Sequence, residues 1–258
     1  MSLERGRSVA TLIHSEYSEA VHNLMLLAFA SCLMIMAFAQ TQEGRSDPID
    51  GIALPVSGAP VSLEAVGFTE DTLADGIVKT RISKGSIYRD AAGRIRNESN
   101  LPLGPQGQPF QVTRITDPVV GVQFILIVQE KVAYRLPFPK AEPPSEPRFV
   151  LILGSELVRE TGGKTHKNEA LGKKIIEGIE FEGSRTTTTL VAQPSRIAVD
   201  EYWISRDLGL IGLVAKSSPR GKTGVSIQNV ARKEPAPSLF VVPLEYRIED
   251  VAIPDQPK

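Results

Sequence analysis

Few side chains in this sequence are suited to acid–base or nucleophilic chemistry. His166 is the only histidine after residue 22, and Cys32 is the only cysteine. A Ser-His-Asp arrangement would need His166 as its base, but this residue falls in a predicted loop, where a histidine is more often simply solvated. The pair Asp200-Glu201 suggests the carboxylate chemistry of glycosidases. Neighbouring strand residues point to opposite faces, however, which favours an edge or cap role. We therefore predict no catalytic residue and no enzyme activity.

Two Gly-Lys-Thr triplets, at residues 163–165 and 221–223, resemble part of a phosphate-binding loop. That motif needs another glycine five residues before the glycine that precedes lysine. Val158 and Lys216 occupy those positions, so both triplets are interpreted as turns. One histidine and no cysteine after residue 39 also leave no zinc site of the usual composition and no disulfide. The sequence thus predicts neither a metal nor a cofactor.

The charges nearly balance, with 29 Lys and Arg against 30 Asp and Glu. Nucleic-acid binding relies on a basic surface, so we predict no nucleic-acid partner. Arg89, Arg94 and Arg96 cluster around a predicted hairpin and could form an anion site. Charged residues at a hairpin tip are more often solvated, and this is the alternative interpretation of the cluster.

The N-terminal region has the pattern of an export signal. Residues 24–39 carry no charge, and the run is shorter than the roughly 20 apolar residues of a membrane span. Ala37 and Ala39, followed by Gln40, place small residues where signal peptidase accepts them. We predict that residues 1–39 form a helical signal cleaved before Gln40, so that no permanent membrane span remains. An uncleaved anchor and a lipidated Cys32 are the alternatives. A mature chain without cysteine suits the bacterial periplasm or cell surface.

From residue 61 onward, apolar residues alternate with polar ones, and turn signals recur about every eight to twelve residues, as in antiparallel sheets and barrels. Gly or Pro-Gly combinations mark the turns at residues 75–76, 90–93, 117–121, 206–209 and 218–221. A further turn is predicted at the polar residues 129–131. The sequence predicts a mainly β protein of about a dozen strands, forming a curved antiparallel sheet or unclosed barrel.

This sheet accounts for one domain, residues 61–252. Residues 40–60 are predicted to be a flexible N-terminal segment and residues 253–258 a flexible tail. Residues 137–168 begin with a proline-rich run that cannot donate a regular ladder of hydrogen bonds, so we predict an insertion loop there. Residues 122–128 are almost all apolar, which indicates a strand covered on both faces.

Four side chains are candidates for lining a ligand cavity. Tyr202 and Trp203 form the most distinctive aromatic pair, and one of the two should enter the interior because neighbours in a strand face opposite sides. Phe124 and Leu126 lie in the apolar strand. Core packing is the plainer interpretation, and the sharper hypothesis is an apolar ligand site.

The order of several motifs resembles a family of exported bacterial proteins of unknown function. The motifs lie at residues 73–76, 87–96, 115–122, 169–186, 201–208 and 235–246. The Trp-containing strand and the closing Phe240-x-x-Pro243-x-x-Tyr246 are also remotely similar to the lipoprotein-carrier superfamily. That superfamily contains outer-membrane lipoprotein carriers and envelope-stress sensors (LolA/RseB-like half-barrels). The resemblance implies an unclosed barrel whose concave apolar face is covered by helices, although helix-like sequence is scarce after residue 40.

These observations lead to three hypotheses of function. The first is an exported, non-enzymatic protein whose concave face holds a hydrophobic ligand, such as a lipid or acyl chain, or a segment of a lipoprotein or envelope partner. The second is an envelope interaction or structural protein with a filled core and no small ligand, acting through strand edges and the Pro-rich loop. The third is a carboxylate-dependent hydrolase. An open apolar cavity favours the first, a packed interior the second, and clustered buried carboxylates the third.

Overall fold

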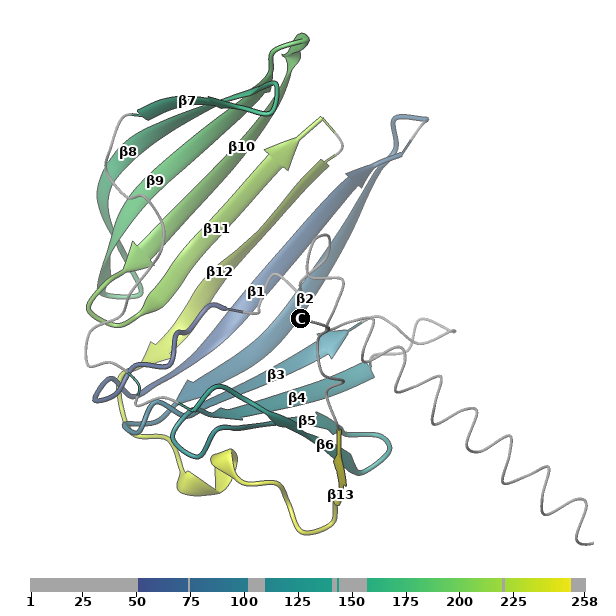
Figure 1. Cartoon of the computed structure of the whole chain (residues 1–258), viewed down its shortest axis with the longest axis vertical. Helices are drawn as coiled ribbons and strands as arrows, with labels where there is room; N and C mark the ends of the chain where they lie inside the picture. The colour runs from purple at the N-terminus through teal and green to yellow at the C-terminus, as the bar shows by residue number, and fades with distance from the viewer. Residues whose placement is uncertain are drawn as a thin grey trace, which may run out of the picture. The chain divides into compact units, whose positions relative to one another are not determined.

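A computed structural model describes residues 51–73, 75–101, 110–140, 143, 157–219 and 221–251. These residues form a single sheet of 13 strands and one short 3-10 helix, η1 (Figure 1). In the part of the chain that the structure describes, no helix has the length and apolar character needed to cross a membrane. The strands are β1 (Val61–Thr72), β2 (Val78–Arg89), β3 (Ile95–Leu101), β4 (Phe110–Asp117), β5 (Val122–Ile127), β6 (Val132–Pro137), β7 (Leu157–Thr161), β8 (Lys164–Ile176), β9 (Ile179–Leu190), β10 (Gln193–Ser205), β11 (Leu210–Ser218), β12 (Gly221–Ala231) and β13 (Arg247–Asp250), and η1 is Pro237–Phe240.

Strand order follows chain order in two blocks that meet in the middle of the sheet. The order is β13-β6-β5-β4-β3-β2-β1-β12-β11-β10-β9-β8-β7. Strands β1 to β6 and β7 to β12 therefore each form an antiparallel meander, and the pairing of β1 with β12 joins them. The sheet does not close, since β13 and β7 lie at its two ends. The predicted unclosed antiparallel sheet is confirmed, except that β13 pairs with β6 in parallel.

Glycines at the predicted turns explain where the strands reverse. Gly76 and Gly93 both have φ +82°, a left-handed conformation that costs glycine little because it has no Cβ. Gly76 lies in the turn between β1 and β2, and Gly93 lies in the turn between β2 and β3. The β8–β9 turn was not among the predicted ones. Glu177 and Gly178 have φ +50° and +73° and turn β8 into β9.

Two predicted irregular segments are corrected in part. The insertion loop was placed at residues 137–168, yet residues 157–161 and 164–168 belong to β7 and β8. Residues 51–60 were expected to be flexible, but Ile52 and Val56 are 1% and 0% exposed. The predicted signal at residues 1–39, its cleavage residues Ala37, Ala39 and Gln40, and the tail at residues 253–258 lie outside the described residues.

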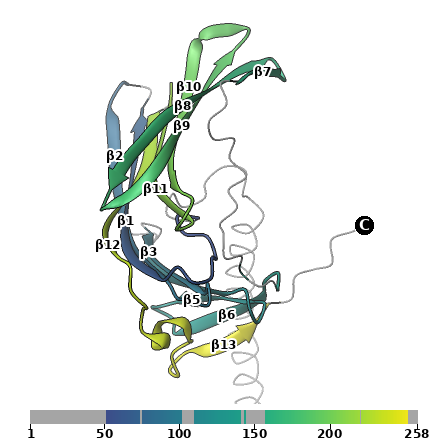
Figure 2. The ribbon, with the colours of Figure 1, turned by 90° about the vertical axis from the view of Figure 1, so that its left-hand side faces the viewer.

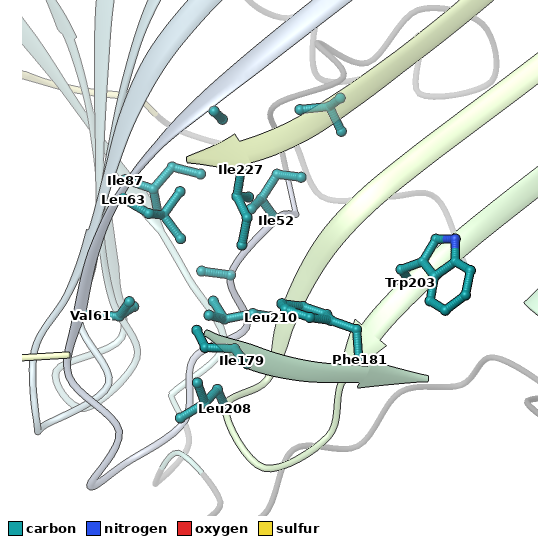
Figure 3. Close-up of a cluster of buried hydrophobic side chains, with 13 residues drawn as sticks. Ile52, Val61, Leu63, Ile87, Ile179, Phe181, Trp203, Leu208, Leu210 and Ile227 are labelled. Carbon is teal, nitrogen blue, oxygen red and sulfur yellow. The ribbon is translucent and has the colours of Figure 1, made fainter. Parts of the chain in front are cut away.

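The apolar core lies on both faces of the sheet. The larger cluster joins β1, β2 and β12 to β9–β11 and includes Ile52 from the segment before β1 (Figure 3). A smaller cluster on β4–β6 comprises Ile115, Leu126 and Ala133, and residues after η1 pack on it. Strand β5 thus has buried side chains on both faces, because Leu126 and its neighbour Ile127 are 1% and 6% exposed. The prediction for residues 122–128 is thus confirmed at the end of the strand, whereas residues 122–125 are half-buried.

Candidate functional site

The two faces of the sheet differ in what covers them. We call inner the face that carries Leu63, Ile87 and Asn97, which are paired across β1, β2 and β3. Residues 51–60, here called the N-terminal strap, lie on this side, whereas η1 lies on the opposite, outer side (Figure 2). Strand register then assigns the remaining side chains to a face, because successive residues alternate.

A pocket of about 220 Å³ lies on the inner face between the strap and strands β2–β5. One wall is apolar and the other presents polar side chains from β3, β4 and β5. The lining residues are Gly51, Ile52, Ala53, Leu54, Pro55, Ile87, Ile95, Asn97, Arg114, Thr116, Gln123 and Phe138.

Backbone hydrogen bonds fix the strap against the start of β11. The amide of Ile211 donates to the carbonyl of Ile52 at 2.8 Å, and the amide of Leu54 donates to the carbonyl of Gly209 at 2.9 Å. Ala53 forms an isolated β-bridge with Leu210. The strap therefore behaves like a short additional strand, and its position determines one wall of the pocket.

Arg89 on β2 connects the strap to the sheet through hydrogen bonds. Its side chain is 0% exposed and donates to the carbonyls of Ala59 at 2.8 Å, Leu54 at 2.7 Å and Leu208 at 2.6 Å. Burial lowers the pKa of Arg89 to about 10, so the guanidinium stays charged at neutral pH. Two strap carbonyls and one from the β10–β11 turn thus converge on one cation.

The arginine cluster around the β2–β3 hairpin is neither solvated nor gathered into an anion site. Besides the buried Arg89, Arg94 Nε lies 2.6 Å from Asp90 Oδ2, and its guanidinium lies 5.1 Å from the centre of the Phe240 ring. Arg96 pairs with Glu98 at 2.6 Å and donates to the carbonyl of Leu239 at 3.0 Å. Arg94 and Arg96 instead attach the segment around η1 to the outer face.

The start of the proline-rich segment closes one end of the pocket. Phe138 lines the pocket, and its amide donates to the carbonyl of Gly121 at 3.0 Å. Further along, Ser57 Oγ in the strap donates to the carbonyl of Pro143 at 3.1 Å. A Cβ on Gly93 would lie 2.8 Å from the Pro143 ring. Glycine at this turn therefore allows both the reversal and the close approach.

Phe124 and Leu126 lie on the outer face and do not line the pocket. Gln123, their neighbour on β5, is the inner-face residue. Leu126 is 1% exposed in the small cluster, and Phe124, Val242 and Tyr246 pack against it. The side chains of Phe124 and Leu126 therefore contact the C-terminal segment in this structure.

Tyr202 and Trp203 point to opposite faces, as predicted, and neither lines the pocket. Tyr202 pairs with Val214 on the inner side, beyond the strap, and Lys216 Nζ lies 5.7 Å from its ring centre. Trp203 is 8% exposed and lies against Gly183, where a Cβ would come within 2.7 Å of the indole.

Polar side chains hold the Trp203 ring in place. Its Nε1–H donates to Glu201 Oε1 at 2.7 Å, and Lys174 Nζ lies 3.9 Å from the ring centre. Arg185 donates to Glu201 Oε2 at 3.0 Å. Burial by itself would raise the pKa of Glu201, but the hydrogen bonds from Trp203 and Arg185 outweigh it and the pKa falls below its usual value. Glu201 is therefore held ionised as a structural partner of Trp203.

The other residues considered for catalysis, His166 and Asp200, lie on different strands, β8 and β10. His166 lies in β8 rather than in a loop, with Nδ1 3.0 Å from Thr188 Oγ1. Asp200 is paired with Thr186 and Lys216 across its neighbouring strands. In the described part of the chain, no group of three or more His, Cys, Asp or Glu side chains is placed to hold a metal ion.

The pocket residues were not predicted as a site. Asn97, Arg114, Thr116 and Gln123 are ordinary polar residues of strands. The available signal was their position, because Arg114 and Thr116 stand two apart on β4 and so share the inner face. Recognising it required the register of β3–β5 and the path of the strap.

Several solved structures of bacterial proteins match this chain at low sequence identity. The Pseudomonas aeruginosa MucA/MucB complex matches with 15% identity and a TM-score of 0.36, covering 74% of this chain and 59% of that one. Mycobacterium tuberculosis lipoprotein LppX matches with 12% identity, a TM-score of 0.31 and coverages of 67% and 87%. A LolA superfamily protein from Nitrosomonas europaea matches with 5% identity, a TM-score of 0.31 and coverages of 76% and 94%.

No family model matches the sequence, and no curated protein matches it. The chain spans 59% of the length of the MucA/MucB match. The matched structures include a LolA superfamily protein, from the group of half-barrels that the sequence remotely resembles. The resemblance to the exported family of unknown function stays a prediction.

Proposed function

We propose that this chain is an exported, non-enzymatic binding protein that holds an apolar ligand in the inner-face pocket. The observation that carries the proposal is the pocket itself, since the strap and strands β2–β5 leave about 220 Å³ unfilled beside Ile52, Ile87 and Ile95. The pocket is open to solvent on one side, so a ligand could reach its apolar residues. Ligand pockets are lined mainly by apolar side chains with a few polar groups, which is the composition found here.

The size of the pocket limits the ligand. Pockets for drug-sized molecules range from about 300 to 1,000 Å³, so a pocket of about 220 Å³ suits a short chain or one apolar side chain of a partner. If the ligand is a lipid, an acyl chain or a lipoprotein segment, only part of that molecule fits between the strap and the sheet.

The proposal predicts that filling the pocket abolishes binding. In Ile95→Trp, the larger ring occupies the space beside the strap, because Ile95 lines the pocket and is only half-buried. We expect an apolar dye to fluoresce with the purified full chain and to stay dark with this variant. Native mass spectrometry of protein purified without detergent should show an extractable ligand only in the parent.

A control keeps the test specific. Ile82→Trp places the same ring on β2 at a side chain that is 61% exposed, and it should leave dye and ligand binding unchanged. Both variants should retain the circular dichroism spectrum of the parent. Equal dye binding by Ile95→Trp and the parent would contradict the proposal.

One observation favours the interaction protein without a small ligand as a second candidate. The tip of the β1–β2 hairpin exposes Leu73, Ile77, Val78 and Ile82 by 46% to 61%, and exposed apolar patches mark interaction surfaces. A parent protein that carries no ligand and leaves the dye dark would favour this candidate. The hydrolase hypothesis gains no support, because Glu201 is bonded to Trp203 and Arg185.

Export is the second part of the proposal. It is supported by the uncharged residues 24–39 and the small residues Ala37 and Ala39 before Gln40. We expect the protein recovered from the periplasm of a bacterial host to begin at Gln40. Intact-mass measurement tests this, and a recovered chain that still contains residues 1–39 would contradict cleavage.

A further inference from the structure

The first half of β2 has one edge without a neighbouring strand. β2 pairs with β1 along its whole length. Its pairing with β3 starts only at Gly85, which stands opposite Ser99 on β3. Among the described strands, none pairs with residues 78–84 on that side, and Figure 1 shows β2 running on past β3 there. Residues 78–84 therefore form a strand edge, here called the open edge, that another strand can join.

The open edge presents the backbone groups of every second residue. In the β1–β2 turn, the amide of Leu73 donates to the carbonyl of Ile77 at 2.8 Å, so this carbonyl points toward β1. Successive strand residues direct their backbone groups to opposite sides, and the even-numbered residues of β2 therefore face away from β1. The far end of β2 agrees, because the amide of Asp90 donates to the carbonyl of Arg94 on the β3 side at 3.1 Å. The residues that present N–H and C=O groups at the open edge are Val78, Thr80, Ile82 and Lys84.

Side chains along the open edge alternate between two kinds. Val78 and Ile82 lie on the outer face and are 55% and 61% exposed. Lys79 and Arg81 lie on the inner face, where Arg81 pairs with Asp71 at 2.6 Å. A peptide that joins the sheet as a further strand also alternates its side chains between the two faces. One set of its side chains would meet apolar surface, and the other set would meet positive charge.

The charge of the open edge decides which kind of strand it accepts. Lysine on a strand edge hinders pairing with a like edge, and like charges on adjacent strands are destabilising. Two copies of this chain joined here would bring Lys79, Arg81 and Lys84 of both copies together. Acidic side chains are attracted to the same place. The open edge therefore disfavours a second copy and favours a partner strand that carries carboxylates on its inner side.

We propose that the open edge is a docking site for an extended peptide segment of another protein, in which acidic and apolar residues alternate. Such a segment adds a strand beside β2, and its main-chain hydrogen bonds supply affinity while its side chains supply specificity. Its carboxylates lie near Lys79 and Arg81, and its apolar side chains lie near Val78 and Ile82. None of the residues of the open edge lines the inner-face pocket, so this inference goes beyond the proposed function and is independent of it.

Three octapeptides with blocked ends test the inference on the full chain. The first alternates glutamate and valine, the second alternates lysine and valine, and the third contains the residues of the first in two blocks, glutamates then valines. Hydrogen exchange of backbone amides, followed by NMR, shows which groups a peptide covers. At about ten times its Kd, the first peptide should slow exchange about tenfold at the even-numbered residues of the open edge. Lys79 and Arg81 should not change, because their amides point to β1.

Charge preference gives a second readout. We expect the alternating glutamate peptide to bind about tenfold more tightly than the lysine peptide, as for two surface charge pairs. Lys79→Glu should reduce this preference about fivefold. Lys164→Glu is the matched control, because Lys164 is an exposed lysine at the start of β8, far from β2 in the strand order; it should leave the preference unchanged.

A backbone variant tests the edge itself. Thr80→Pro removes an N–H that points to the open edge and keeps the bonds to β1, a position at which sheets accept proline. It should abolish the slowing of exchange by the glutamate peptide. The circular dichroism spectrum of this variant should match that of the parent.

Two results would overturn the inference. One is equal affinity for the alternating and the block peptide, which would mean that charge alone attracts the peptide. The other is unchanged exchange at the even-numbered residues of the open edge with the glutamate peptide in excess. Both measurements use the parent protein alone, so the inference stays testable if Thr80→Pro fails to fold.

Discussion

Replacing Arg89 by leucine is expected to lower the free energy of unfolding by about 3–5 kcal/mol, because three carbonyls lose a charged donor at about 1–3 kcal/mol each. The guanidinium is the donor for three carbonyls, those of Leu54, Ala59 and Leu208. Leucine fills part of the space but supplies no donor, and each buried carbonyl left without one costs about 1–3 kcal/mol. Removing a buried charge returns some desolvation energy, which keeps the loss below the sum of these terms.

Urea denaturation of the full chain measures this loss. Arg81→Leu is the control, because Arg81 is an exposed arginine paired with Asp71, and surface pairs of this kind contribute about 0–1 kcal/mol. Hydrogen exchange should also show faster opening of residues 52–54 in Arg89→Leu, since the strap loses its attachment. A change of less than about 1 kcal/mol, within the range of exposed sites, would show that Arg89 does not hold the strap.

The second large effect is expected where Trp203 lies on Gly183. A Cβ at residue 183 would lie 2.7 to 2.8 Å from three indole atoms. Lys174 above the ring and Glu201 at its nitrogen oppose displacement of the indole. We expect Gly183→Ala to cost about 1–3 kcal/mol, the usual penalty for overpacking. Trp203→Leu removes more buried surface, and we expect a loss of about 3 kcal/mol.

The double variant distinguishes contact with the ring from a general intolerance of alanine. With leucine at residue 203, alanine at residue 183 has room, and replacing glycine within a strand should then be neutral or stabilise by up to about 1 kcal/mol. A double-mutant cycle by urea denaturation would show this reversal of sign. If Gly183→Ala costs the same in both backgrounds, the indole is not what requires glycine there.

The hairpins were predictable from sequence because their turns depend on one residue type. Gly76 and Gly93 adopt positive φ, and few residues other than glycine do so at little cost. The β8–β9 turn escaped prediction because Glu177 supplies one of its two positive φ values and the flanking residues are apolar on both sides. The parallel β13 was also missed, since the sequence pattern of a strand does not state which neighbour it pairs with.

The pocket could not be predicted, for a different reason. Its walls come from the strap, from β2–β5 and from Phe138, segments whose proximity depends on long-range pairing. Arg89 illustrates the difficulty, because an arginine next to a turn is expected at the surface. Its burial depends on three carbonyls supplied by distant segments, including Leu208. The aromatic residues that drew attention in the sequence, Tyr202 and Trp203, lie further along the sheet.

The seam between β1 and β12 divides the folding of this protein into two kinds of event. Every other antiparallel pair joins strands that are consecutive in the chain, so each meander grows by hairpins that close over short loops. Across the seam, Gln228 bonds to Glu64, 164 residues earlier. Contacts of such sequence separation form slowly, since the entropy of closing the loop precedes their gain. When the first meander is complete, one edge of β1 has no partner until β12 has been synthesised. During that interval this edge can pair with another molecule.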